Sequence, residues 1–89
     1  MAWQIKFDEG AKKDISKLDR QTAKRITNFL SDRLAKLENP RSLGEALKGS
    51  KLGEFWRYRV GDYRIIVSIE DSTLSILVVK VGNRKEIYR

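Results

Sequence analysis

The 89-residue sequence contains no cysteine and no histidine. Without cysteine it has no disulfide framework and no thiolate metal site, so a reducing compartment such as the cytoplasm is permitted. Without histidine it lacks the commonest general base and the commonest transition-metal ligand. Any catalysis must therefore use arginine, lysine, tyrosine, serine or carboxylate side chains.

Long apolar runs are also missing. The sequence has no stretch of 18 apolar residues, and the N-terminal MAWQIKFDEG holds too short an apolar stretch for a signal peptide. We therefore expect a cytoplasmic protein with no membrane partner. A hydrophobic content of 40% is enough for one core, which predicts a single domain over residues 1–89.

Basic residues exceed acidic ones by 19 to 12, which gives a formal net charge of +7. A surplus of this size on a short chain favours polyanionic or acidic partners, such as nucleic acid, the ribosome, a membrane surface or an acidic protein. The plain alternative is that the charge only keeps the protein soluble.

In the first half of the chain, the spacing of the apolar residues indicates one strand followed by two helices. Residues 3–7 (WQIKF) alternate as in a half-buried strand. Asp8 and Asp19 are positioned as N-caps of two runs that each carry one apolar helical stripe. Pro40 ends the second run, because the residue before a proline disfavours the helical conformation. Residues 40–53 predict a loop, with room for one helical turn at 43–48.

From residue 54 onwards, apolar residues recur at every second position. The runs EFWRYRV, YRIIVSI and LSILVVKV predict three strands. Gly61-Asp62 predicts a type II′ hairpin turn between the first two, and Asp71-Ser72 is a weaker turn signal before the third. The predicted fold class is α+β, in the order β-αα-βββ: a mostly antiparallel four-stranded sheet with a helical hairpin packed on one face.

The first hairpin fixes which side chains share a face. With Gly61-Asp62 as the loop, Arg59 lies opposite Arg64, and Arg57 is on the same face. The other face carries the predicted core residues Trp56, Tyr58, Val60, Tyr63, Ile65, Val67 and Ile69. Directly opposed arginines repel, at a cost of a few tenths to about 1 kcal/mol, so we expect this face to bind an anion. Guanidinium groups match phosphate oxygens; the alternative is a solvated face with acidic partners.

With a turn at Asp71-Ser72, the arginine face also carries apolar residues, namely Ile66, Leu77, Val79 and Val81. We expect these apolar side chains to be covered by the C-terminal tail or by a partner chain. The alternative is that they are simply exposed to solvent. The tail VGNRKEIYR bends at Gly82 and brings Arg84, Lys85 and Tyr88 towards this face. The alternative is a frayed basic tail.

Arginines stabilise charge, and a tyrosine whose pKa is lowered by nearby cations can transfer a proton. This combination suits RNA cleavage, because RNA supplies its own nucleophile, the 2′-hydroxyl. The enzyme then has to orient the backbone and stabilise a dianionic phosphorane. We expect no cofactor and no metal, since the sequence shows neither a carboxylate cluster near the basic group nor a P-loop or dinucleotide motif.

The blocks LGEFWRYRVGDYRIIVSI and VVKVGNRKEIYR resemble the RelE/ParE superfamily of toxins from bacterial type II toxin–antitoxin systems. The resemblance extends in order over residues 1–89, favours the RelE-like branch and implies the same β-αα-βββ fold. Toxins of that branch enter the ribosomal A site and cut mRNA without metal, leaving a 2′,3′-cyclic phosphate. The resemblance therefore implies a metal-independent endoribonuclease, or mRNA interferase, that inhibits translation.

On the matching positions, the resemblance implies a catalytic set of Arg59, Arg64, Arg84 and Tyr88. Arg64 and Arg84 would stabilise the transition state, and Arg59 would do the same or assist proton transfer to the leaving oxygen. Tyr88 would orient or deprotonate the 2′-hydroxyl. RNA backbone would be bound by Arg57 and Lys85.

Three departures from the family pattern bear on this assignment. Many relatives have histidine at the position of Asn83. Some relatives have lysines, which are better proton donors, at the positions of Arg57 and Arg59. The chain stops one residue after Tyr88, so no further C-terminal helix is expected to cover the site.

The resemblance also implies partners. These are a RelB-like antitoxin that wraps the toxin, the ribosome and its mRNA, and operator DNA through the antitoxin complex. Two alternatives remain open. The ParE branch shares the fold but inhibits DNA gyrase, and it typically lacks the full arginine–tyrosine set. A non-catalytic nucleic-acid-binding module would bind RNA in a salt-dependent way and cut nothing.

Overall fold

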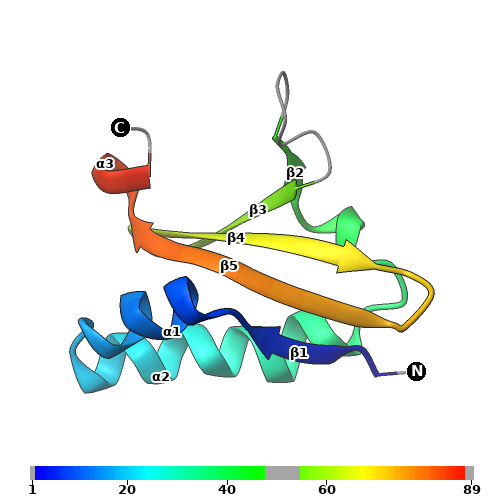
Figure 1. The fold of residues 1–89 in the computed structure, drawn as a ribbon, viewed down its shortest axis with the longest axis horizontal. Coiled ribbons are helices and arrows are strands. Elements are labelled where there is room, and N and C mark those ends of the chain that lie inside the picture. Colours follow the sequence, from blue (N-terminus) through cyan, green and yellow to red (C-terminus); the bar gives the residue numbers. More distant parts are fainter. Residues whose placement is uncertain (1, 48–54, 88–89) are drawn as a thin grey trace.

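The computed structural model describes residues 2–47 and 55–87. One sheet has the strand order β1-β5-β4-β3-β2. Its strands are β1 (Gln4–Phe7), β2 (Glu45–Ala46), β3 (Phe55–Val60), β4 (Tyr63–Glu70) and β5 (Ser75–Asn83). The helices α1 (Glu9–Ser16) and α2 (Arg20–Asn28) cover one face, and α3 (Arg84–Ile87) lies on the other side (Figure 1).

The predicted α+β class is confirmed, with one strand more than expected. β1 runs parallel to β5, and the other pairs are antiparallel. The fifth strand is β2, which pairs with Trp56 and Arg57. The helical turn predicted at 43–48 is wrong in its described part, because that pairing holds the chain extended. A 3₁₀ turn, Pro40–Ser42, comes before it, and residues 48–53 lie outside the described residues.

Both predicted N-caps are confirmed. The Asp8 carboxylate accepts a hydrogen bond from the Ala11 N–H at 2.8 Å, and that of Asp19 accepts one from the Thr22 N–H at 3.1 Å. Each cap satisfies an N–H group that the first helical turn leaves without a partner.

The second helical run is less regular than predicted. It continues from α2 into a π-helical turn, Phe29–Arg33, and then a 3₁₀ turn, Leu34–Lys36. The buried residues Ile26, Leu30 and Leu34 are spaced by four. On a regular α-helix of 3.6 residues per turn, that spacing drifts around the helix. A wider turn keeps the three side chains aligned towards the sheet.

The predicted register of the β3–β4 hairpin is confirmed, from Val60 opposite Tyr63 to Trp56 opposite Val67. Gly61 has φ +59°, and an added Cβ would lie 3.1 Å from the Arg25 guanidinium. The positive φ favours glycine here, and a Cβ would also require a small shift of the Arg25 guanidinium. The hairpin residues predicted for the core face are buried or half-buried against the helices.

The register predicted for β4 and β5 is only partly correct. The turn covers Asp71 to Leu74 and is two residues longer than expected. Because the difference is an even number, each side chain at the start of β5 keeps its predicted face, and Leu77 lies on the arginine face. Val67 pairs with Val78 and Ile66 pairs with Lys80, so Val79 is the extra residue of a β-bulge. Because a bulge reverses the alternation that follows it, Val81 faces the core and is 3% exposed.

Asp14 of α1 completes the edge of β5 where β1 has ended. Its carboxylate accepts a hydrogen bond from the Val81 N–H at 3.0 Å. β1 pairs with β5 only as far as Val78, so α1 supplies the acceptor that a longer β1 would have supplied. This contact fixes β5 immediately before Gly82.

We expect Asp14→Ala to lower the free energy of unfolding by about 1–3 kcal/mol, because the buried Val81 N–H loses its acceptor. Asp14→Asn keeps an acceptor oxygen and should lose less than half as much. Urea denaturation of the wild type and both variants measures the difference. Equal losses in the two variants would contradict the role of the hydrogen bond.

Tyr58 joins the sheet to the loop that follows the helices. It is 2% exposed, and its hydroxyl donates to the Pro40 carbonyl at 2.7 Å. Burial raises the pKa of Tyr58 to about 12, with a small opposing effect from Arg41. The folded protein therefore favours the neutral phenol.

Because the folded pKa of Tyr58 lies above its ordinary value of about 10, its contribution to stability is complete below pH 10. That contribution is lost as the pH rises towards 12. Tyr58→Phe should cost about 1–3 kcal/mol at pH 7, since the Pro40 carbonyl loses its short hydrogen bond and is left with the longer one from the Leu43 N–H at 3.4 Å. Between pH 10 and 12 the variant's unfolding free energy should fall less steeply than that of the wild type. Parallel pH profiles in urea denaturation would refute this.

Candidate functional site

Three strand arginines lie on the face of the sheet away from α1 and α2. Arg57 and Arg59 project from β3 and Arg64 from β4, with Arg59 directly opposite Arg64. Gly82 of β5 is the partner of Arg64 on its other side. Because glycine has no side chain, β5 places nothing beside Arg64 at this position.

Arg64 is the buried centre of this group, at 6% exposed. Its Nη1 donates to the carbonyls of Gly61 at 3.3 Å and Tyr63 at 3.1 Å. Its Nε is buried and has no hydrogen-bond partner among the described residues. Burial lowers the pKa of Arg64, and Arg59, Arg84 and Arg57 lower it further, while Asp62 opposes them. A buried guanidinium among like charges is a suitable receptor for an anion.

Arg84 joins this group from the other end of the chain. Its N–H donates to the Asp62 carbonyl at 2.9 Å, which holds the start of α3 against the β3–β4 turn. The Asn83 side chain accepts from the Lys85 N–H at 3.0 Å and so caps the short helix. The sequence did not predict α3, and the bend follows Asn83 instead of Gly82, which stays within β5.

The predicted site residues are thus partly brought together. The four arginines 57, 59, 64 and 84 converge, because Arg57 and Arg59 share the face of Arg64 and the Arg84 N–H is bound to the β3–β4 turn. Arg59, Arg84 and Arg57 each lower the pKa of Arg64. Lys85 follows Arg84 on α3 and is exposed. Tyr88 lies outside the described residues.

Glu45 is a neighbour of the site that the sequence did not indicate. Its carboxylate forms a hydrogen-bonded ion pair with Arg57, across the β2–β3 pair. This contact lowers the pKa of Glu45, and the more distant Arg59 and Arg64 add to the effect. No sequence pattern signals the pair, since it depends on a two-residue strand within a predicted loop.

Within residues 2–47 and 55–87, no group of three or more acidic, histidine or cysteine side chains is arranged to hold a metal ion. In the same part of the chain, no helix is long and apolar enough to cross a bilayer. The charged groups gathered on the arginine face are guanidiniums around the buried Arg64.

Comparison with known families gives a match over residues 5–88 to the ParE toxin of the type II toxin–antitoxin system parDE. The chain belongs to this toxin family. It is therefore a type II toxin of the RelE/ParE superfamily, as its sequence motifs indicated.

Individual relatives are RelE-like. A RelE-like toxin protein of Escherichia coli is 34% identical over 96% of this chain and 86% of the relative. The toxin in the RelBE2 toxin–antitoxin complex of Mycobacterium tuberculosis has the same fold, with a TM-score of 0.85 and 23% identity over 94% of this toxin and 93% of that chain. In the archaeal RelE–RelB complex of Pyrococcus horikoshii, the matching chain gives a TM-score of 0.73 and 27% identity over 94% and 97%.

The opposed arginines of this toxin should cost it stability. We expect Arg59→Gln to raise the free energy of unfolding by about 0.2–1 kcal/mol, because it removes the repulsion with Arg64. The gain should shrink in high salt. Urea denaturation at two salt concentrations tests this, with Lys24→Gln, an exposed cation on α2, as the charge-matched control. A loss of stability would show that Arg59 makes a stabilising contact.

Proposed function

We propose that residues 1–89 act as one toxin domain that cuts mRNA in the ribosomal A site and so inhibits translation in the cytoplasm. The observation that carries this proposal is the buried Arg64, whose Nε has no partner among the described residues and which is surrounded by Arg57, Arg59 and Arg84. This arrangement supports binding of a phosphate whose charge increases during reaction.

The proposed reaction needs only the RNA and these side chains. The 2′-oxygen attacks the adjacent phosphorus, and the bond to the 5′-oxygen breaks, which leaves a 2′,3′-cyclic phosphate and a free 5′-hydroxyl. Arg64 and Arg84 stabilise the dianionic phosphorane, and Arg59 does the same or assists the departing oxygen. Tyr88 orients or deprotonates the 2′-hydroxyl, while Arg57 and Lys85 hold the RNA backbone.

The ribosome has a defined part in this proposal. The chain has no histidine, and arginine is a poor proton donor at neutral pH. Catalysis must therefore come mainly from orientation and charge stabilisation. The ribosome supplies the orientation by holding the mRNA in line for attack.

The proposed protein partner is a RelB-like antitoxin. Membership of a type II toxin family supports it, as does the matching archaeal RelE chain, which was solved together with RelB. Operator DNA would be bound through the complex of the two proteins. Half-buried apolar residues on the arginine face, Ile66 and Leu77, give such a partner surface to cover.

One observation favours a second function, inhibition of DNA gyrase. The matching family is described by its ParE members. Against it, four arginines that can stabilise a phosphorane meet on one face of the sheet in this chain. A gyrase inhibitor needs no buried arginine among like charges.

The test is primer extension on mRNA bound to programmed ribosomes. The wild type should cut at the A-site codon. Arg84→Ala should lower the cleavage rate by about 10²–10³-fold, as expected for loss of one donor to a developing oxyanion, and Tyr88→Phe should also reduce it strongly. Lys24→Ala is the control and should retain the wild-type rate.

Intact mRNA with well-folded wild type would refute the nuclease, and a supercoiling assay would then test gyrase inhibition. A non-catalytic binding module would give a different result. The wild type would bind RNA without cutting it, and Arg84→Ala would lower the affinity for RNA by an amount that depends on the salt concentration.

A further inference from the structure

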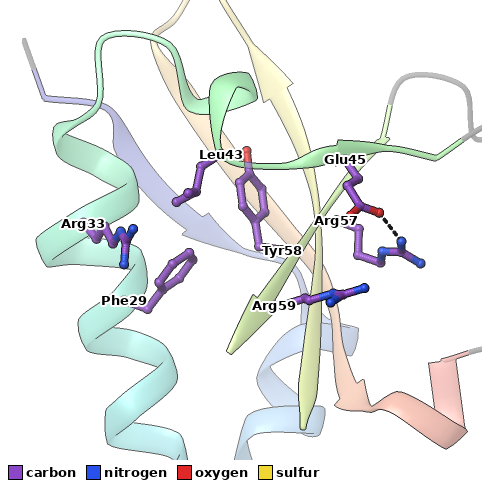
Figure 2. A pocket seen from close by; sticks show the side chains of 7 residues that line it. All are labelled: Phe29, Arg33, Leu43, Glu45, Arg57, Tyr58 and Arg59. Atoms are coloured by element: carbon purple, nitrogen blue, oxygen red, sulfur yellow. Dashed lines mark hydrogen bonds and ion pairs between the residues drawn. The ribbon is translucent and has the colours of Figure 1, made fainter. Parts of the chain in front are cut away.

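A hollow of about 240 Å³ lies at the outer edge of β3, beside the arginine face. We name it the edge pocket. Its lining residues are Phe29, Arg33, Leu43, Glu45, Arg57, Tyr58 and Arg59. Phe29 and Arg33 approach from the helical side, whereas Arg57 and Arg59 extend on the other side of β3 (Figure 2).

The pocket exists because β2 is short. β2 pairs only with Trp56 and Arg57, so within the described part of the chain the side of β3 away from β4 has no neighbouring strand at Arg59. The space beside Arg59 is bordered instead by Leu43, which precedes β2, and by the turn that follows α2. An RNA strand lying across the arginine face reaches this edge at Arg59.

The lining combines apolar surface with cations. Leu43, at 39%, is the one large apolar side chain that is strongly exposed among the described residues. Phe29 is half-buried beside Tyr58, with the two ring centroids 6.1 Å apart. Arg33 is exposed and takes part in no ion pair or hydrogen bond within residues 2–47 and 55–87. Three arginines face one carboxylate, which gives the pocket a net positive charge.

An irregular turn presents two of these residues. Phe29 and Arg33 begin and end the π-helical turn, and the Leu34 N–H donates to the Phe29 carbonyl across it. Single π-helical turns inside helices occur frequently at functional sites. This observation is independent of the pocket's charge and volume.

The size and chemistry of the pocket select the ligand class. Pockets for drug-sized ligands measure roughly 300–1,000 Å³, so this one accommodates a single flat ring system. Single-stranded RNA is recognised by packing its bases on aromatic and arginine side chains and by hydrogen bonds to the base edges. A nucleobase with its phosphate fits both the apolar and the cationic lining.

We propose that the edge pocket is a nucleotide subsite for the base that neighbours the scissile phosphate. The inference rests on the proposed nuclease function and adds a specificity site to it. The base lies between Phe29 and Leu43, and Arg33 binds the phosphate that leads away from the site. Arg59 is shared between the edge pocket and the arginine face, which makes the two sites continuous.

Glu45 gives the subsite a base preference. Its carboxylate accepts hydrogen bonds and donates none when ionised, and its pairing with Arg57 lowers its pKa. Guanine presents two adjacent donors, its N1–H and its exocyclic amino group, to a carboxylate, whereas the other three bases present one donor group beside acceptors. Glu45 therefore favours guanine.

The experiment is single-turnover cleavage of mRNA on programmed ribosomes over a range of toxin concentrations. Arg33→Gln should raise the half-saturating concentration about tenfold, as expected for loss of a charge-assisted hydrogen bond, with little change in the limiting rate. Leu43→Ser should shift the concentration in the same direction. Lys24→Gln removes an exposed cation of the same helical run outside the pocket, and should change neither quantity more than about twofold.

A second measurement tests the base preference. Messenger RNAs carrying each of the four bases on either side of the cut should show a preference for guanine at one position. Glu45→Gln should reduce that preference, because an amide can also donate. Thermal melts of all variants confirm that they are folded, which is expected since Arg33, Leu43 and Glu45 are exposed.

The outcomes separate the two proposals. If the wild type cuts and Arg33→Gln behaves like Lys24→Gln, the subsite is refuted and the nuclease stands. If the wild type leaves mRNA intact, the nuclease is refuted and the subsite with it. If Arg33→Gln weakens binding of the antitoxin and leaves cleavage unchanged, the pocket is a protein-docking surface and the RNA subsite is wrong.

Discussion

The placement of Arg59 directly opposite Arg64 is the constraint on which this structure depends. The two-residue turn at Gly61-Asp62 sets that pairing, and Gly61 is held in a conformation that only glycine adopts easily. Two adjacent guanidiniums repel, so the sheet keeps them together only because its other face is well packed. That packing includes Ile65 and Val67, both fully buried. The cost on one face is offset by burial on the other.

The second half of the site is built from contacts distant in sequence. Asp14 fixes β5 at Val81, a bulge has already reversed the strand's alternation, and the Asp62 carbonyl receives the N–H of Arg84. Each contact positions the start of α3 against the β3–β4 turn. Arg84 is therefore brought to the arginine face by two contacts, the Asp14–Val81 hydrogen bond and the hydrogen bond from its own N–H to the Asp62 carbonyl.

The short strand β2 links the arginine face to its surroundings. It brings Glu45 to Arg57, so one cation of the group is partly neutralised before any ligand arrives. It also ends early and leaves the edge of β3 open beside Arg59. The same two residues thus moderate the charge of the arginine face and create space next to it. Under the proposed nuclease function, the arginine face serves as the non-specific phosphate site and the edge pocket as the neighbouring site that contacts bases.

The sequence by itself determined the helix caps, the core face of the hairpin and the convergence of Arg57, Arg59 and Arg64. These follow from local rules: a capping side chain, a two-residue turn and strict alternation along a strand. Only the tertiary structure decided the bulge at Val79, the pair of Glu45 with Arg57 and the π-helical turn at Phe29–Arg33. The bulge and the ion pair depend on how two strands pair, and the π-helical turn fits the second helical run to the sheet, so no pattern within one segment encodes them.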